Sequence, residues 1–264
     1  MVGDGVANRA RVRDAIVAAA DAGARVIVLP ELANVGYMFT DLAELRAVAE
    51  TAHGQSVQEW VVLARDRDLL IVGGFAEAGT DGHVYNSAVI VDKTGCRAVY
   101  RKAHLWDGEK NDLFTAGSAA PPVVDTPWGR IGVVICYDLE FPEWIRTVAL
   151  DGAELLCCPV NWPVYPRPSG ERPTEIVKVQ ANANVNRMFI AVADRVGMER
   201  GQDWLGGSTI VDADGFPLTT ISLAEEALFM ADLDLAEARA KAISARNDVH
   251  GDRRPEMYTR VTTS

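Results

Sequence analysis

The chain alternates between two spacings of apolar residues, which indicates that helices and strands follow one another along most of its length. Apolar residues three and four positions apart predict helices over residues 7–22, 56–68, 142–150, 173–187 and 236–245. Short apolar and β-branched runs predict strands over residues 25–29, 69–76, 84–91, 97–101, 131–135, 155–159, 188–193, 208–211 and 228–233. This mixture of crossover helices and hairpins indicates an α/β protein with helices outside stacked sheets. No linker or repeat divides residues 1–264, so we expect one domain.

One predicted strand ends on a cysteine and leads directly into a helix. Residues 130–143 read RIGVVICYDLEFPE, with Cys136 at the strand end and Pro142 suited to the first turn of the helix. A side chain at such a turn is presented at the sheet edge, where nucleophiles are often placed. A helix N-terminus beside the sulfur would also favour thiolate over thiol. The alternative is a cysteine that is simply buried in the core.

Two other strand ends carry side chains that suit the same chemistry. Glu31 follows the strand 25–29 in the sequence LPEL, and Lys102 follows the strand 97–101 in YRKAHL. Parallel strands in α/β proteins carry reactive groups at their C-terminal ends. A carboxylate, an ammonium group and a thiol could therefore meet in one pocket, although each charged group taken alone suits a solvated loop equally well.

These motifs together resemble the nitrilase superfamily of carbon–nitrogen hydrolases. LPEL, YRKAHL and ICYDLEFPE stand in the family's order, and WDGEKNDLFTAG supplies a matching second glutamate, Glu109. Further matches are Gly36-Tyr37, the sequence YNS at 85–87, GSTIVDADG at 207–215, and DRRPEMY near the C-terminus. The resemblance covers essentially the whole chain and implies a four-layer α-β-β-α sandwich.

The resemblance also implies a role for each of four residues. Cys136 is expected to be the nucleophile, and Glu31 to take the thiol proton and later activate water. Lys102, together with a backbone N–H that is best supplied by Tyr137, is expected to stabilise the oxyanion. Glu109 is expected to position the substrate or to orient Lys102. A buried cation would in addition keep Glu31 and the thiolate charged.

Two alternatives to this mechanism remain open at the level of sequence. A cysteine–histidine pair that uses His104 is the rival within enzymes. A catalytically silent, nitrilase-like binding protein is the alternative outside enzymes, but it would need a lost catalytic residue, and all four are present. No metal or other cofactor is expected, because no C-x-x-C or H-E-x-x-H spacing occurs.

The residues after the cysteine bear on the reaction type. Family members that hydrolyse nitriles tend to carry Trp-Glu there, whereas Tyr137-Asp138 is similar to the amidase, ω-amidase and carbamoylase branches. We therefore expect a small amide substrate, a thioester intermediate and release of ammonia. The alternatives are an N-carbamoyl amine or amino acid, and a nitrile. Tyr137 is also expected to contact the substrate.

Three further residues are candidates for the acyl pocket. Tyr37 follows Gly36, and Asn161-Trp162 follow the predicted strand 155–159. Trp162 could instead be a core residue. Arg167 and Arg172, in the proline-rich loop, could bind a substrate carboxylate or could simply be solvated.

Composition excludes several kinds of partner. The formal net charge of −11 argues against nucleic acid and against an anionic membrane surface. No apolar run approaches the roughly 20 residues of a membrane span, and no signal peptide is evident. Cys157 and Cys158 are adjacent in one apolar strand, which does not suit a disulfide framework. We expect a cytoplasmic enzyme.

The chain departs from the family pattern at its start. Family members usually open with an apolar strand that ends in a glutamine, whereas residues 1–4 here lead almost directly into the first helix. We expect this first strand to be absent, which would leave backbone groups of a sheet unpaired. The predicted helix 142–150 carries more apolar surface than one core face needs. The resemblance implies pairing there, with the C-terminal arm, in a homodimer or higher homo-oligomer.

Overall fold

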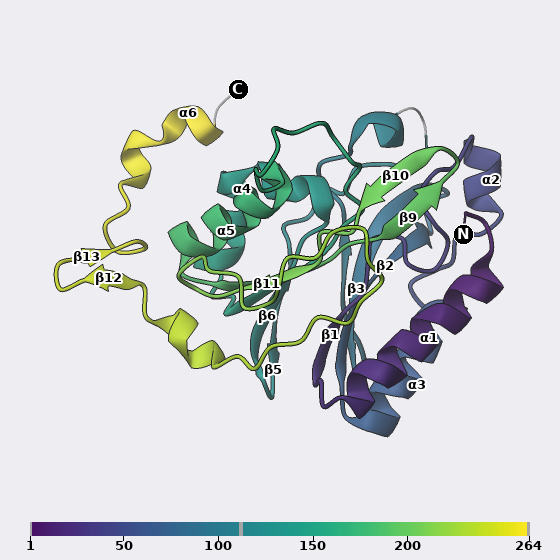
Figure 1. Cartoon of the computed structure of the whole chain (residues 1–264), viewed down its shortest axis with the longest axis horizontal. Coiled ribbons are helices and arrows are strands. Elements are labelled where there is room, and N and C mark those ends of the chain that lie inside the picture. The colour runs from purple at the N-terminus through teal and green to yellow at the C-terminus, as the bar shows by residue number, and fades with distance from the viewer. Residues whose placement is uncertain (1, 111–112, 263–264) are drawn as a thin grey trace.

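The computed structural model describes residues 2–110 and 113–262. Two sheets pack face to face, and helices cover the outer face of each, so that the layers run helix, sheet, sheet, helix (Figure 1). The expected α-β-β-α arrangement is therefore confirmed. No helix in the described ranges is long and apolar enough to cross a membrane.

The first sheet has four strands and lies under two helices. Its spatial order is β1 (Val26–Val28), β2 (Leu70–Ala78), β3 (Val84–Asp92) and β4 (Gly95–Arg101). β1 and β2 are parallel, and the other pairs are antiparallel. Its outer face is covered by α1 (Gly5–Asp21) and α3 (Gln55–Arg67). Because both faces of the sheet are covered, β3 is buried along its whole length.

The second sheet has five strands. Its spatial order is β11 (Thr209–Val211), β8 (Phe189–Ala193), β7 (Leu155–Pro159), β6 (Gly129–Val133) and β5 (Val123–Thr126). The central strands β6, β7 and β8 are parallel, joined by α4 (Pro142–Leu150) and α5 (Thr174–Asn186), which cover the outer face. Gly132 lets α4 approach closely, because a Cβ there would lie 2.6 Å from Val148.

Alternating side chains of the first sheet serve two separate cores. Val72 and Ile90 pack into the core shared with the second sheet, whereas Ile71 and Val89 pack under α1 and α3. β1 is an edge strand of the four-stranded sheet, and its outer side pairs with no strand of the described residues.

The remaining elements are short. They comprise α2 (Leu42–Arg46), η1 (Asp107–Lys110), η2 (Cys136–Glu140), the hairpin β9 (Val196–Glu199) and β10 (Gln202–Leu205), η3 (Leu235–Arg239), β12 (Ala242–Ser244), β13 (Asn247–Asp248), η4 (Pro255–Met257) and α6 (Thr259–Thr262). Figure 1 shows β12, β13 and α6 projecting away from the layered body.

Two of the predicted elements are wrong. Residues 228–233 form no strand, because an apolar alternation needs a neighbouring strand and a core, and Leu228 here stays 52% exposed. The helix predicted over 236–245 is replaced by η3 and then β12. Good helix formers alone do not hold a helix of that length when packing is missing, and Ile243 is 60% exposed.

Candidate active site

The nucleophile candidate lies at a strained turn between β6 and α4. Cys136 begins η2 with a φ of 47°, a left-handed conformation that residues other than glycine seldom adopt. The side chain of Asp138 holds this turn by accepting hydrogen bonds from the Ile135 N–H at 3.0 Å and the Tyr100 hydroxyl at 2.7 Å. The cysteine is thus presented at the sheet end, as its sequence setting predicts.

Glu31 lies at the corresponding turn after β1. The next residue, Leu32, has a φ of 48°, and the Glu31 carbonyl accepts a hydrogen bond from Asn161 Nδ2 at 3.0 Å. Gly74 of β2 makes room for the turn, because a Cβ there would lie 2.6 Å from the Glu31 Cα. The turn therefore packs directly against the sheet, with its carboxylate directed inwards.

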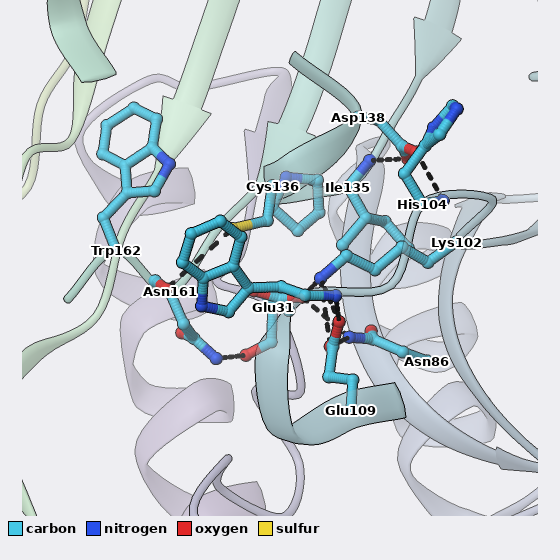
Figure 2. Close-up of polar contacts among 12 residues, drawn as sticks. Glu31, Asn86, Lys102, His104, Glu109, Ile135, Cys136, Asp138, Asn161 and Trp162 are labelled. Carbon is cyan, nitrogen blue, oxygen red and sulfur yellow. Dashed lines mark hydrogen bonds and ion pairs between the residues drawn. The ribbon is translucent and has the colours of Figure 1, made fainter. Parts of the chain in front are cut away.

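Four buried polar side chains form one cluster. Lys102 Nζ lies 2.8 Å from Glu31 Oε1 and 2.8 Å from Glu109 Oε2 (Figure 2). Asn86 Nδ2 donates to the same two carboxylates, at 2.7 Å and 2.6 Å. None of the four side chains is more than 2% exposed. The fold thus brings Glu31, Lys102 and Glu109 together, although Glu109 comes from η1 and not from a strand end.

Charge balance in this cluster sets its proton affinities. Burial opposes the charged form of Lys102, but Glu109 and Glu31 outweigh it, and the pKa of Lys102 lies well above its ordinary value. Burial raises the pKa of Glu31, Lys102 opposes that rise, and Glu109 adds to it. Glu31 Oε2 is buried and has no hydrogen-bond partner among the described residues. That oxygen is free to accept a proton.

Cys136 holds a neutral thiol at rest. Its Sγ lies 3.9 Å from the Asn161 carbonyl, and its pKa is raised well above the ordinary value by burial and then by the charge of Glu31, against Lys102. Lys102 lowers the pKa of the thiol, as predicted for a buried cation, but burial and Glu31 outweigh it, so the predicted resting thiolate is not supported. η2 is a single short turn, and two carboxylates already occupy the cation.

His104 does not form a pair with Cys136. Its Nδ1 lies 2.7 Å from Asp138 Oδ1, and its ring stacks on Phe141 with centroids 3.8 Å apart. Figure 2 shows the ring on the Asp138 side of the turn, away from the sulfur. The histidine supports the nucleophile's turn from outside, which the sequence did not indicate.

An ion pair below the site was also missed by sequence reasoning. The guanidinium of Arg195 donates to the Glu31 carbonyl at 3.3 Å and to Asn161 Oδ1 at 3.2 Å, and pairs with Glu199. Glu199 accepts a hydrogen bond from the Tyr37 N–H at 2.9 Å. This partly buried ion pair thus links three separate segments of the chain. The only sequence signal is an arginine and a glutamate four residues apart, which is common on exposed surfaces.

Asp194 fixes the neighbouring loop. Its carboxylate accepts hydrogen bonds from the N–H groups of Trp162 at 3.0 Å and Gly207 at 2.7 Å. Burial raises the pKa of Asp194 to about 7, against these hydrogen bonds. The Trp162 ring belongs to the hydrophobic core and is 6% exposed, so the core alternative describes its position.

A pocket of about 140 Å³ adjoins the cluster through Glu109 and Asn161. Tyr37 and Asn161 line it, whereas Tyr137 and Trp162 do not. The Tyr137 ring instead packs edge-on against Trp106 and Phe141, with centroids 4.8 Å and 5.3 Å apart. The lining includes neither of the loop arginines considered from sequence. The pocket is largely apolar and reaches the groups that acyl transfer requires through two lining residues. Glu109 contacts Lys102, and the Asn161 carbonyl lies 3.9 Å from the Cys136 sulfur.

Comparisons with known proteins agree with this arrangement. A family model described as carbon–nitrogen hydrolase matches residues 3–242. A nitrilase from Pyrococcus abyssi is 37% identical over 257 residues, 96% of this chain and 93% of the relative. An (R)-stereoselective amidase from Pseudomonas sp. is 35% identical over 241 residues, 90% of this chain and 83% of the relative.

Solved structures add the fold and the type of chemistry. An amidase from Nesterenkonia sp. matches with a TM-score of 0.80 and 25% identity over 98% of this chain and 92% of that one. Another structure of that amidase shows Michael addition of acrylamide at its active-site cysteine. These relatives support hydrolysis of an amide C–N bond. Similarity of sequence and of fold over nearly the whole length shows that this chain belongs to the carbon–nitrogen hydrolase family.

Proposed function

We propose that this enzyme hydrolyses a small amide through a thioester on Cys136, with Glu31 as general base and acid and Lys102 as oxyanion stabiliser. The observation that carries the proposal is the position of Lys102. Its ammonium group is fully buried and contacts the carboxylates of both Glu31 and Glu109. The unpartnered Glu31 Oε2 supports the role as proton acceptor.

The reaction begins with a neutral thiol. Glu31 takes the proton from Sγ while the sulfur attacks the amide carbon and the C–S bond forms. The electron pair moves to the amide oxygen, which is stabilised by Lys102 Nζ and by the Tyr137 N–H. When the oxyanion collapses, the C–N bond breaks and Glu31 returns the proton to the nitrogen, which leaves as ammonia. Water then attacks the thioester, and its proton passes through Glu31 to the departing sulfur.

Glu109 acts in this scheme by positioning Lys102. Both of its carboxylate oxygens contact Nζ, at 3.0 Å and 2.8 Å, and the Trp106 N–H donates to it at 2.6 Å. A carboxylate held at both oxygens is poorly placed to shuttle protons. Glu31, with one oxygen free, is better placed.

The Tyr137-Asp138 pair favours amides and N-carbamoyl compounds over nitriles, and the relatives named as amidases favour amides. Propanamide and propanenitrile share one acyl group, so ammonia release from the two tests the reaction type directly. We expect the amide to react faster. Cys136→Ala should abolish turnover, while Cys157→Ala, a buried thiol in the same sheet, should keep most of it. Faster turnover of the nitrile would overturn the reaction type, and an active Cys136→Ala variant would overturn the mechanism.

We also propose that the enzyme works as a homodimer or a higher homo-oligomer, in the cytoplasm. Support for assembly comes from exposed apolar side chains on the α4–α5 side and on the projecting C-terminal segment: Leu150, Val177, Val185, Ile243, Met257 and Val261. Support for the location comes from four free cysteines, which suit a reducing compartment. Sedimentation of an active monomer at micromolar concentration would contradict the first proposal.

A further inference from the structure

We propose that the pocket next to the Glu31–Lys102–Glu109 cluster selects uncharged acyl groups of about the volume of one six-membered ring. This inference rests on the proposed amide hydrolysis and names the class of acyl group for it. Two properties of the pocket support it: its size and walls, and its charge.

The size and walls of the pocket suit a compact apolar group. Its volume is about 140 Å³, and its aromatic walls are Tyr37, Phe39, Trp106, Phe114, Tyr165 and Trp204. A protein cavity of about 150 Å³ holds a benzene molecule, so one ring or a branched chain of similar volume would fill this space. Burial of such a group favours binding by roughly 25 cal/mol for each Å² of apolar surface. Acetamide would leave most of the pocket empty.

The pocket wall is held in a fixed position. Tyr37 and Trp204 meet edge to face, with ring centroids 5.3 Å apart and planes at 78°. The Tyr37 N–H donates a hydrogen bond to Glu199, which in turn pairs with the partly buried Arg195. Because the Tyr37 ring contacts Trp204 and its backbone contacts Glu199, this side of the pocket is rigid, and it limits the size of the acyl group that can bind.

The charged residues of the pocket lining disfavour an anionic acyl group. They are Asp107 and Glu109, and no lysine or arginine is among the lining residues. The ammonium of Lys102 is already shared by Glu31 and Glu109, and Arg195, which contacts the lining residue Asn161, is paired with Glu199. A carboxylate at the far end of a substrate would therefore lose its water without gaining a free cationic partner. Amides with a terminal carboxylate are poor substrates in this scheme.

Three amides of nearly equal shape separate these requirements. 4-Methylpentanamide carries an apolar end, 4-oxopentanamide a neutral acceptor, and succinamate a carboxylate at the same position. We expect kcat/KM to rise at least about tenfold from acetamide to the first two. We expect succinamate to fall about a hundredfold or more below 4-oxopentanamide, because each 1.4 kcal/mol is a factor of ten. Equal turnover of succinamate and 4-oxopentanamide would overturn the charge argument.

A variant assigns the charge effect to its residue. Asp107→Asn should narrow the gap in kcat/KM between succinamate and 4-oxopentanamide, because it removes a negative charge from the pocket lining. An unchanged gap would show that Asp107 does not disfavour the carboxylate.

Binding provides a readout independent of turnover. Calorimetry with Cys136→Ala should show tighter binding of 4-oxopentanamide than of succinamate. Turnover of acetamide separates the two levels of proposal. If no amide reacts, amide hydrolysis itself fails. If acetamide reacts and the three isosteric amides do not differ, only the pocket inference fails.

Discussion

At the scale of single residues, one buried cation serves two carboxylates. Lys102 offsets Glu31 and Glu109, which leaves the site with one excess negative charge before the thiol ionises. A thiolate at Cys136 would add another, and the raised pKa of the thiol reflects burial and the charge of Glu31. In the proposed mechanism, the sulfur therefore loses its proton to Glu31 during attack and not beforehand.

Removal of the cation is the sharpest test of this charge balance. Lys102→Met would leave two buried carboxylates without a counter-charge and the oxyanion without its fixed donor. We expect kcat to fall about a hundredfold or more with a modest change in KM, measured by ammonia release. His104→Asn, which removes the ring on the far side of the turn, should be mild. An equal loss in His104→Asn, with a mild Lys102→Met, would favour the cysteine–histidine mechanism.

At the scale of elements, several polar groups of the site, including Glu31, Lys102 and Asn161, lie just beyond the ends of strands. Asp194 comes directly after β8 and holds the N–H groups of two loops with a carboxyl whose pKa is about 7, against an ordinary 3.8. The native state thus keeps this proton at pH values where the unfolded chain has lost it. The stability gained from the neutral carboxyl is present below about pH 4 and is lost as the pH rises through about 7.

This linkage predicts a pH-dependent difference between two proteins. The free energy of unfolding of the wild type, minus that of Asp194→Asn, should fall as the pH rises from about 4 to 7, by at most about 1.4 kcal/mol per pH unit. Urea titrations at several pH values measure it. A difference that stays constant across this window would show that Asp194 does not titrate there.

Strand ends are also the part of the site that sequence could predict. Glu31, Lys102 and Cys136 each come just after a short apolar segment that predicts a strand. Their positions at strand ends could therefore be predicted from the neighbouring residues alone. The hairpin β9–β10 was not predicted, because its turn is Arg200-Gly201, both at positive φ, and arginine is an unusual first residue for such a turn. Trp204 and Arg195 therefore went unassigned. Their positions depend on loops that only tertiary packing brings beside the nucleophile.

At the scale of the whole molecule, the site straddles two sheets. Glu31 and Lys102 extend from the four-stranded sheet and Cys136 from the five-stranded one. The distance between the base and the sulfur therefore depends on how the inner faces of the sheets pack. The shared core, which includes Val72 and Ile90, sets that spacing.

Two substitutions of the same kind can distinguish an effect of the spacing between the sheets on activity from an effect of lost stability. Ile90→Val removes a methylene from the core between the sheets, and Ile71→Val removes one from the core under α1 and α3. Both side chains are fully buried, so each variant should lose about 1 kcal/mol of stability. We expect only Ile90→Val to lower kcat, by about threefold or more, because small displacements of reacting groups are costly. Equal effects on kcat would show that sheet spacing does not tune the site.

The protonated sulfur also bears on how long the enzyme survives oxidants. Peroxide attacks thiolates, and exposure governs the rate. Cys136 is 8% exposed and neutral at rest, so peroxide should convert it to sulfinic acid far more slowly than it oxidises a small free thiol. Mass spectrometry of the Cys136 peptide during peroxide treatment measures this, and oxidation as fast as that of the free thiol would contradict it. An idle enzyme would then keep its nucleophile intact under oxidative stress and expose it to risk only during turnover.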